Sequence, residues 1–159
     1  YLLSIPLLLL WLNIMKKLFL LTLMSSSLFL SAELWKDYEP SEQQIQLTVV
    51  DVQSNYLDYY LVNLNKTWVR AMEVQKDLGQ IVDYGVYTSD GASSPNVWLT
   101  ITYADMASMA PSKEKEDAVN AEMKKRYGDN DEEMEKISRG YEEIRKMVDN
   151  QRINQVIFK

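Results

Sequence analysis

The stretch Ile45-Gln-Leu-Thr-Val-Val-Asp-Val52 alternates apolar and polar residues and is rich in β-branched side chains. Alternation at a period of two predicts a β-strand. Ser54 then stands where a helix N-cap is expected, and leucine, tryptophan and methionine recur at helical spacing as far as Leu78. Gly79 follows this stripe, as a glycine commonly does at the C-terminal end of a helix. The sequence therefore predicts a strand followed by one long amphipathic helix.

The rest of the chain adds strands and helices in an order that defines a fold. Strands are predicted over Ile81–Thr88 and Val97–Ala104, and a charged helix over Ser112–Tyr127. A second helical stripe runs from Met134 to Val148, and Gln155–Phe158 is predicted as a short last strand. With the late helices taken as one broken helix, β-α-β-β-α-α-β is the ferredoxin-like pattern. We expect an α+β domain with a four-stranded antiparallel sheet, helices on one face and the other face open.

Side chains alternate across a strand, so each predicted strand contributes to both faces of the sheet. The face predicted to meet the helices holds Ile45, Leu47, Val49, Val82, Val86, Val97, Leu99 and Ile101. The face predicted to be open holds Gln46, Thr48, Val50, Asp83, Tyr87, Trp98, Thr100 and Thr102. A face that mixes aromatic rings with hydroxyls fits a homodimer packed sheet to sheet, or a site for a small apolar or aromatic ligand. The residues predicted to form this ligand or dimer face are Gln46, Thr48, Tyr87, Trp98, Thr100 and Thr102.

These segments bear a family resemblance. The helix-to-strand stretches Tyr56–Trp68 and Gly79–Tyr84, followed by Asn96–Tyr103, resemble the dimeric α/β-barrel superfamily of ferredoxin-like proteins. The turn ending at Ala107 and the Ile-Arg pair at 144–145 resemble an uncharacterised exported branch of it. The resemblance covers about residues 45 to 159. It implies a dimer, in a group that includes cofactor-free monooxygenases, haem-degrading enzymes, dehydratase-like proteins and members without known activity.

Asp83 is the one carboxylate on the predicted open face. Buried under a partner, its pKa would rise and it could act as a general base, with Tyr87 or Trp98 as a platform for substrate. A cofactor-free oxygenase or isomerase acting on a small aromatic or lipophilic molecule is therefore the alternative function. The leading prediction is a small binding or interaction domain that forms a homodimer through its sheet face and uses no cofactor.

Composition excludes several classes of chemistry. The chain has 159 residues, a formal net charge of −6, no cysteine and no histidine. It therefore forms no disulfide, thiolate zinc site, Ser-His-Asp triad or histidine-ligated haem, and the haem-handling members of the superfamily use a histidine. An acidic chain also lacks the clustered cations that nucleic-acid binding requires, so no nucleic-acid partner is expected.

The N-terminal segment predicts export. Met15 is followed by Lys16 and Lys17, by an apolar stretch, and by Ala32. This is the pattern of a bacterial-type secretory signal peptide. A membrane anchor is the alternative, but the apolar stretch is shorter than a membrane span requires. We expect an upstream non-native extension at 1–14, a signal peptide at 15–32, an extended leader at 33–44 and one ferredoxin-like domain at 45–159. The mature form is expected in the periplasm or outside the cell, without a membrane span.

An acidic cluster follows the charged helix. It comprises Asp129, Asp131, Glu132 and Glu133, whose oxygens are of the kind that calcium prefers. Its spacing does not match a calcium-binding loop, and acidic residues also favour the first turn of a helix. We therefore predict a helix cap here and no metal site.

Overall fold

The computed structural model describes residues 33–89, 94–129 and 131–159. The chain divides into two compact units, one of Glu39–Phe158 and one of Tyr1–Tyr38 with Lys159. In the described part of the second unit, a tight turn closes where the Trp35 N–H donates to the Tyr38 carbonyl at 2.7 Å. The predicted extension and signal peptide, residues 1–32, lie outside the described residues.

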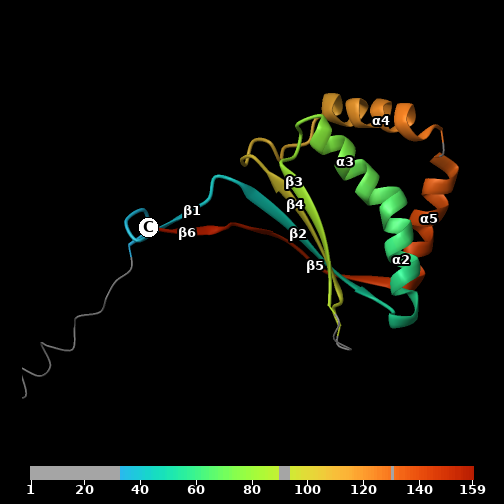
Figure 1. Ribbon diagram of the computed structural model, residues 1–159, viewed down its shortest axis with the longest axis horizontal. Coiled ribbons are helices and arrows are strands. Elements are labelled where there is room, and N and C mark those ends of the chain that lie inside the picture. The colour runs from blue at the N-terminus through green and yellow to red at the C-terminus, as the bar shows by residue number, and fades with distance from the viewer. Residues whose placement is uncertain (1–32, 90–93, 130) are drawn as a thin grey trace, which may run out of the picture. The chain divides into compact units, whose positions relative to one another are not determined.

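The larger unit is built on a four-stranded antiparallel sheet in the order β3-β4-β2-β5 (Figure 1). Its strands are β2 (Gln44–Val52), β3 (Asp83–Thr88), β4 (Val97–Tyr103) and β5 (Arg145–Ile153). A separate two-stranded sheet joins β1 (Tyr38–Pro40) and β6 (Val156–Phe158). In the main sheet the first strand lies between the third and the fourth, which is the ferredoxin-like arrangement. The predicted α+β class and antiparallel sheet are confirmed.

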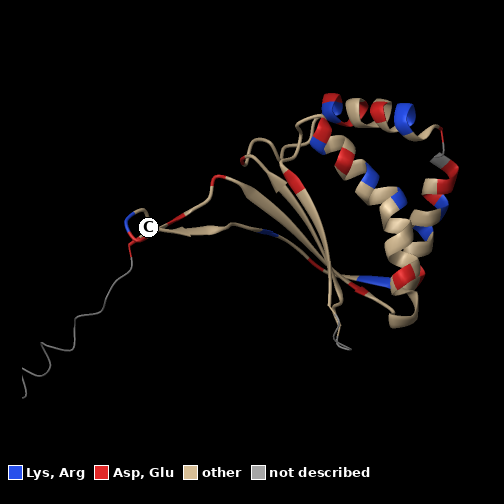
Figure 2. Cartoon of the chain, in the orientation of Figure 1, with Lys and Arg blue, Asp and Glu red and all other residues tan. Residues whose placement is uncertain are grey.

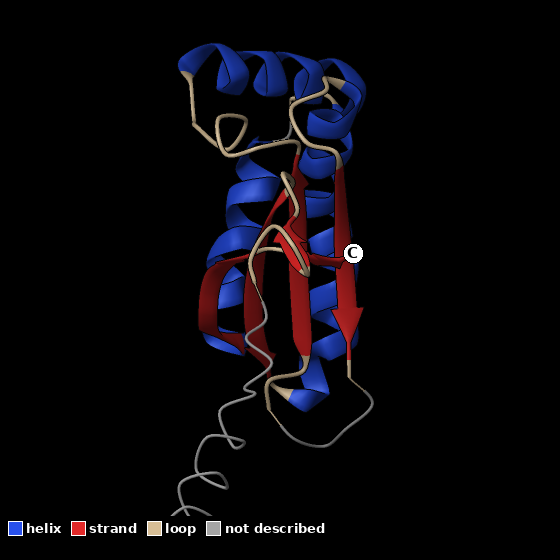
Figure 3. Cartoon of the chain, turned by 90° about the vertical axis from the view of Figure 1, so that its left-hand side faces the viewer, coloured by secondary structure: helices blue, strands red, loops and turns tan. Residues whose placement is uncertain are grey.

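The helices pack on one side of this sheet (Figures 1 and 3). The helical segments are η1 (Ser54–Tyr56), α2 (Leu57–Leu64), η2 (Asn65–Val69), α3 (Arg70–Asp77), α4 (Lys113–Tyr127) and α5 (Asp131–Ile144). The run from α2 to α3 is one helix, interrupted by a π-helical turn at η2. It stops before Gly79, whose φ of 69° suits glycine, as predicted. Ser54, expected as the N-cap, instead lies inside the 3₁₀ turn η1 and makes no cap.

The core joins the sheet to the long helix and α5. Its buried members are Val50, Val52, Val97 and Leu99 from the sheet, and Tyr60, Leu64, Tyr141 and Ile144 from the helices. Each large apolar side chain that becomes fully buried contributes about 1.5–3 kcal/mol of transfer free energy. These residues therefore determine which face of the sheet the helices cover.

A buried polar contact lies within this core. The Thr67 hydroxyl, in the π-helical turn, donates to the Asn63 carbonyl at 3.0 Å and is 3.0 Å from the Tyr141 hydroxyl. Next to it, the Arg145 guanidinium lies 4.5 Å above the Tyr141 ring and donates to the Tyr60 hydroxyl at 3.0 Å. Paired polar groups avoid the cost of burial without a partner. The contact therefore ties α5 and the start of β5 to the long helix.

The fourth strand of the sheet is not the one predicted. Residues 145–153 form β5 and pair with β2 along its length, whereas the sequence pattern extended the last helix to Val148. Gln155–Phe158, predicted as the fourth strand, instead contributes β6 to the small sheet. Pairing with a central strand outweighs a weak helical periodicity, because strand formation depends strongly on its neighbours.

The facing of β2 was also predicted wrongly. Directly paired residues of antiparallel strands share a face, and Val50 pairs with Val97 in the core. By alternation, Gln46 and Thr48 lie on the helix side with Val50, so their placement on the open face is wrong. Ile45, Leu47 and Val49, predicted to face the helices, lie on the open side. The faces predicted for β3 and β4 are correct.

Candidate functional site

No helix of the described residues covers the other side of the sheet, which we call the open face (Figure 3). The strand registers arrange its residues in rows that run from β3 across β4 and β2 to β5. The rows are Tyr87, Trp98, Val49 and Asp149; Gly85, Thr100, Leu47 and Gln151; and Asp83, Thr102, Ile45 and Ile153. A further row at one end of the face holds Asp51 and Lys146. The centre of the open face is therefore apolar, and its charged residues lie on the outer strands and at this end.

The open face is more apolar than the sequence predicted, because β2 turns its isoleucine, leucine and valine toward it. Tyr87 is 58% exposed and Ile153 is 37% exposed, whereas Trp98 is partly shielded by its neighbours. The charged side chains of the unit lie mainly on the helices, and the sheet carries few (Figure 2). Apolar surface that is gathered on one face, rather than scattered, is typical of an interaction site.

Tyr87 folds back along its own strand. A Cβ atom placed on Gly85 would lie 2.6 Å from both Cε2 and the hydroxyl oxygen of Tyr87, and 2.8 Å from the Thr100 Oγ1 atom. The ring thus occupies the space that a side chain at position 85 would need. The Tyr87 ring therefore lies along the sheet over Gly85 and forms part of the open face, and does not project freely into solvent.

Asp83 lies on the open face, as predicted, but at its edge and in an ion pair. Its Oδ1 atom accepts a hydrogen bond from the Lys76 Nζ atom at 2.7 Å, and both side chains are exposed. The hydrogen bond from Lys76 is the main cause that holds the pKa of Asp83 below its ordinary value. A general base at neutral pH needs a raised pKa, so this geometry does not favour the catalytic role considered for Asp83.

Gln46 and Thr48 do not join the open face. The Gln46 side chain donates to the Asn150 Oδ1 atom at 3.3 Å on the helix side of the sheet. Tyr87, Trp98, Thr100 and Thr102 are brought together, because they occupy neighbouring positions on β3 and β4. The structure adds Ile45, Leu47 and Val49 to them.

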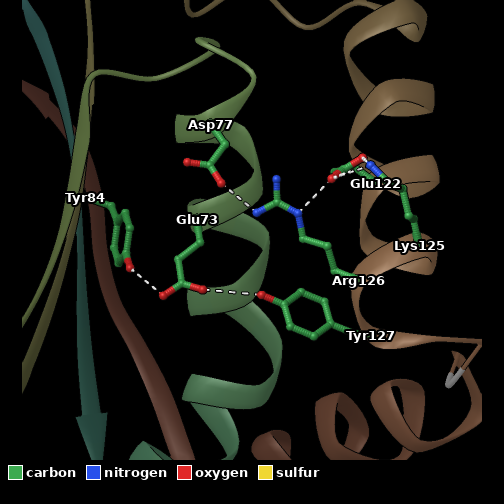
Figure 4. A network of polar contacts seen from close by, with 7 residues as sticks. All are labelled: Glu73, Asp77, Tyr84, Glu122, Lys125, Arg126 and Tyr127. Atoms are coloured by element: carbon green, nitrogen blue, oxygen red, sulfur yellow. Dashed lines mark hydrogen bonds and ion pairs between the residues drawn. The ribbon is translucent and has the colours of Figure 1, made fainter.

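A polar clamp joins α3 to α4 on the helix side (Figure 4). The Glu73 carboxylate accepts from the hydroxyls of Tyr84 and Tyr127, both at 3.4 Å. Burial, and then the charge of Glu73, raises the pKa of Tyr84. One turn further along α3, the Arg126 guanidinium donates to Asp77 at 2.6 Å.

Arg126 also donates to Glu122, at 2.8 Å, within α4. The carboxylates of Glu122 and Asp77 hold the pKa of Arg126 above its ordinary value. The clamp was not predicted from the sequence, because Tyr127 lies 54 positions from Glu73 and no local pattern links them. Its charged groups are exposed or partly exposed, so the clamp positions α4 and adds little stability.

The acidic cluster includes Asp131, whose side chain lies outside the described part of the structure. Asp129 pairs with Lys124. In the described part of the chain, no group of three or more acidic side chains is placed to hold a metal ion. Among the same residues, no helix is long and apolar enough to cross a membrane.

Comparison with known proteins finds similarity in structure only. No protein-family model matches the chain, and no curated protein matches its sequence. Among solved structures, HapK from Hahella chejuensis is similar with a TM-score of 0.42 and 11% identity, over 70% of this chain and 91% of that one. A dimeric ferredoxin-like protein from an uncultured marine organism is similar with a TM-score of 0.42 and 12% identity, over 75% and 90% of the two chains.

A third similar structure is a dimeric protein of unknown function and ferredoxin-like fold from Bacteroides fragilis. It has a TM-score of 0.36 and 11% identity, over 76% of this chain and 99% of that one. The structures whose descriptions mention a fold are thus described as dimeric and ferredoxin-like. The role of this chain is therefore argued from its own surface.

Proposed function

We propose that this protein is a small interaction domain that forms a homodimer through its open face. The supporting observation is the set of apolar side chains that β2, β3 and β4 turn away from the helices, including Leu47, Tyr87 and Trp98. Leaving such a surface in water is costly, at about 25 cal/mol per Å² of apolar area. Burial of this surface against a partner would stabilise the complex by a corresponding amount.

The distribution of charge favours a second copy as the partner. The three rows given above contain no lysine or arginine, and the carboxylates of Asp83 and Asp149 lie on opposite outer strands. Asp51 and Lys146, of opposite charge, pair in a further row at one end of the face. An apolar centre with charges at its rim is the usual anatomy of a protein interface. Two such faces can meet without bringing like charges together at the centre, as an isologous dimer requires.

We further propose that the domain is exported. The support is the segment from Met15 to Ala32, with its basic start, apolar stretch and small final residue. Fractionation of a bacterium that expresses the full chain, with N-terminal sequencing of the product, tests this proposal. A product in the periplasm or medium that begins near Glu33 supports it, and an uncleaved cytoplasmic product contradicts it.

Sedimentation velocity on the full chain tests the homodimer. We expect a concentration-dependent dimer, which Leu47→Glu converts to monomer because a carboxylate would be buried without a partner. Val62→Glu is the matched control, because Val62 is 60% exposed on α2, away from the open face. Its dimer should persist. A wild-type chain that stays monomeric at high concentration, or a Leu47→Glu variant that stays dimeric, contradicts the proposal.

A further inference from the structure

The packing of α4 against the rest of the molecule is incomplete. No residue of α4 is buried. A cavity of about 290 Å³ lies between α4, the end of α3, the end of β4 and the loop before α4. A second hollow, of about 420 Å³, is lined by residues of α3, α4 and α5, and shares Val119 and Asn120 with the first. The first hollow is open to solvent, so a small molecule can enter it from outside.

The wall of the first cavity combines two kinds of side chain. Met109, Pro111 and Val119 are apolar, whereas Gln75, Tyr103 and Asn120 are polar and uncharged. Within the described residues, the side chains of the latter three make no hydrogen bond to the protein. Burial raises the pKa of Tyr103, so its phenol stays protonated and can donate. The cavity thus offers an apolar surface and unused neutral hydrogen-bonding groups.

The charged residues at the cavity are already engaged or exposed. The Lys115 Nζ atom donates to the carbonyls of Ser108 and Ala110, at 2.8 and 3.0 Å. Glu116 faces solvent. No free cation therefore lines the cavity among the described residues, and an anion would lose its hydration without gaining a partner.

The loop that forms one wall is held in place. The Asp105 Oδ1 atom accepts from the Ser108 N–H at 2.7 Å and from its hydroxyl at 2.8 Å. Lys115 anchors the carbonyls of the same loop, and the Gln80 side chain donates to the Lys115 carbonyl at 3.1 Å. These contacts shape the wall before any ligand arrives, which lowers the cost of binding.

We propose that this cavity binds a small uncharged molecule with an apolar body and one hydrogen-bonding group, such as an aromatic alcohol. Its volume is at the small end of the range of about 300–1,000 Å³ for ligand pockets. The ligand would pack against Val119 and Met109 and accept from, or donate to, Tyr103. Because Tyr103 pairs with Gln44 on the helix side of the sheet, this site is separate from the open face and does not rest on the homodimer.

Titration of the full chain with 2-naphthol, followed by ¹H–¹⁵N NMR, tests the proposal. We expect saturable shifts at Gln75, Tyr103 and residues 108–120. The charged analogue 2-naphthoate has the same rings and should bind at least roughly tenfold more weakly, because the cavity offers no free cation. Shifts confined to Tyr87 and Trp98, or shifts that do not saturate, would overturn the proposal.

Two variants sharpen the test. Val119→Trp fills the cavity and should abolish 2-naphthol binding, whereas Ala118→Trp, at an exposed position of the same helix, should leave it unchanged. Tyr103→Phe removes one neutral hydrogen bond and should weaken binding roughly three- to tenfold. If Val119→Trp fails to fold, the Tyr103→Phe result decides the question. Unchanged binding in a folded Val119→Trp variant, or in Tyr103→Phe, contradicts the proposal.

Discussion

The ring of Tyr87 lies over the Cα atom of Gly85 and fills the place of a side chain there. An added Cβ would come within 2.6 Å of the ring and 2.8 Å of the Thr100 hydroxyl. Glycine weakens a strand interior, and an aromatic ring from the same face can cover it. The pair therefore converts an unfavourable strand residue into a flat part of the open face.

Gly85→Ala should displace the Tyr87 ring. The Tyr87 atoms in the way belong to the far end of a flexible side chain, so the ring can swing into solvent, but the Thr100 Oγ1 atom at 2.8 Å belongs to a short, β-branched side chain that must also shift. The free energy of unfolding should therefore fall by about 1–3 kcal/mol. The dimer should weaken more, since the open face loses its flat wall. Urea unfolding and sedimentation velocity measure the two effects.

Tyr87→Ala provides the control for this change. In the double variant Gly85→Ala/Tyr87→Ala no ring remains to displace, so the two effects should not add. Additive losses would show that Gly85 and Tyr87 act independently, contrary to the contact described here.

Thr67→Val should destabilise the core. The substitution keeps the shape but leaves the Tyr141 hydroxyl without its partner at 3.0 Å, at an expected cost of about 1–3 kcal/mol in urea unfolding. Tyr141→Phe should cost a similar amount, and the double variant less than the sum, because the second change removes the orphaned group. Tyr59→Phe, at a tyrosine that is 58% exposed, should have no measurable effect. Equal effects of Tyr59→Phe and Tyr141→Phe would contradict a specific role for the buried contact.

The Lys76–Asp83 pair should appear in a pH titration. The ammonium of Lys76 lowers the pKa of Asp83 in the folded chain below the ordinary 3.8. The pair therefore stabilises the fold at pH values above 3.8, and this contribution is lost as the pH falls through the lower folded-state pKa. Lys76→Met should raise the pKa of Asp83 toward its ordinary value, as measured by ¹³C NMR of the carboxyl carbon.

Lys113→Met is the control for this titration. It removes another exposed lysine, which pairs with Asp117 on α4, and should leave the pKa of Asp83 unchanged. A pKa of Asp83 that is the same in wild type and Lys76→Met would show that the ion pair does not persist in solution.

Deletion of residues 155–159 should leave the main sheet intact. These residues include β6, which pairs with β1 and not with the four-stranded sheet, so the free energy of unfolding should change by about 1 kcal/mol or less. Deletion from residue 148 onward removes most of β5 and should abolish cooperative unfolding. If the shorter deletion also unfolds the chain, Gln155–Phe158 has a larger structural role than the observed pairing gives it.

Local patterns were sufficient for the fold class and for the order of the elements from β2 to α5, but not for the last strand of the main sheet. The long helix ends before Gly79 because backbone conformation there is a local property of the chain. The faces of β3 and β4 were also predictable, since the aliphatic residues of each strand stand at alternate positions and so share one face. Tyr87, Trp98, Thr100 and Thr102 could therefore be assigned to one surface without coordinates.

Packing decided what the alternation left ambiguous. In β2, residues 45, 47 and 49 are apolar on one face and residues 50 and 52 on the other, so the pattern fits either orientation. Contact of Val50 and Val52 with the core around Tyr60 selects one of them, and so turns Leu47 outward. The α3–α4 clamp and the cavity beneath α4 likewise join residues far apart in the chain. Such relationships depend on which surfaces meet, and short-range periodicity carries no information about them.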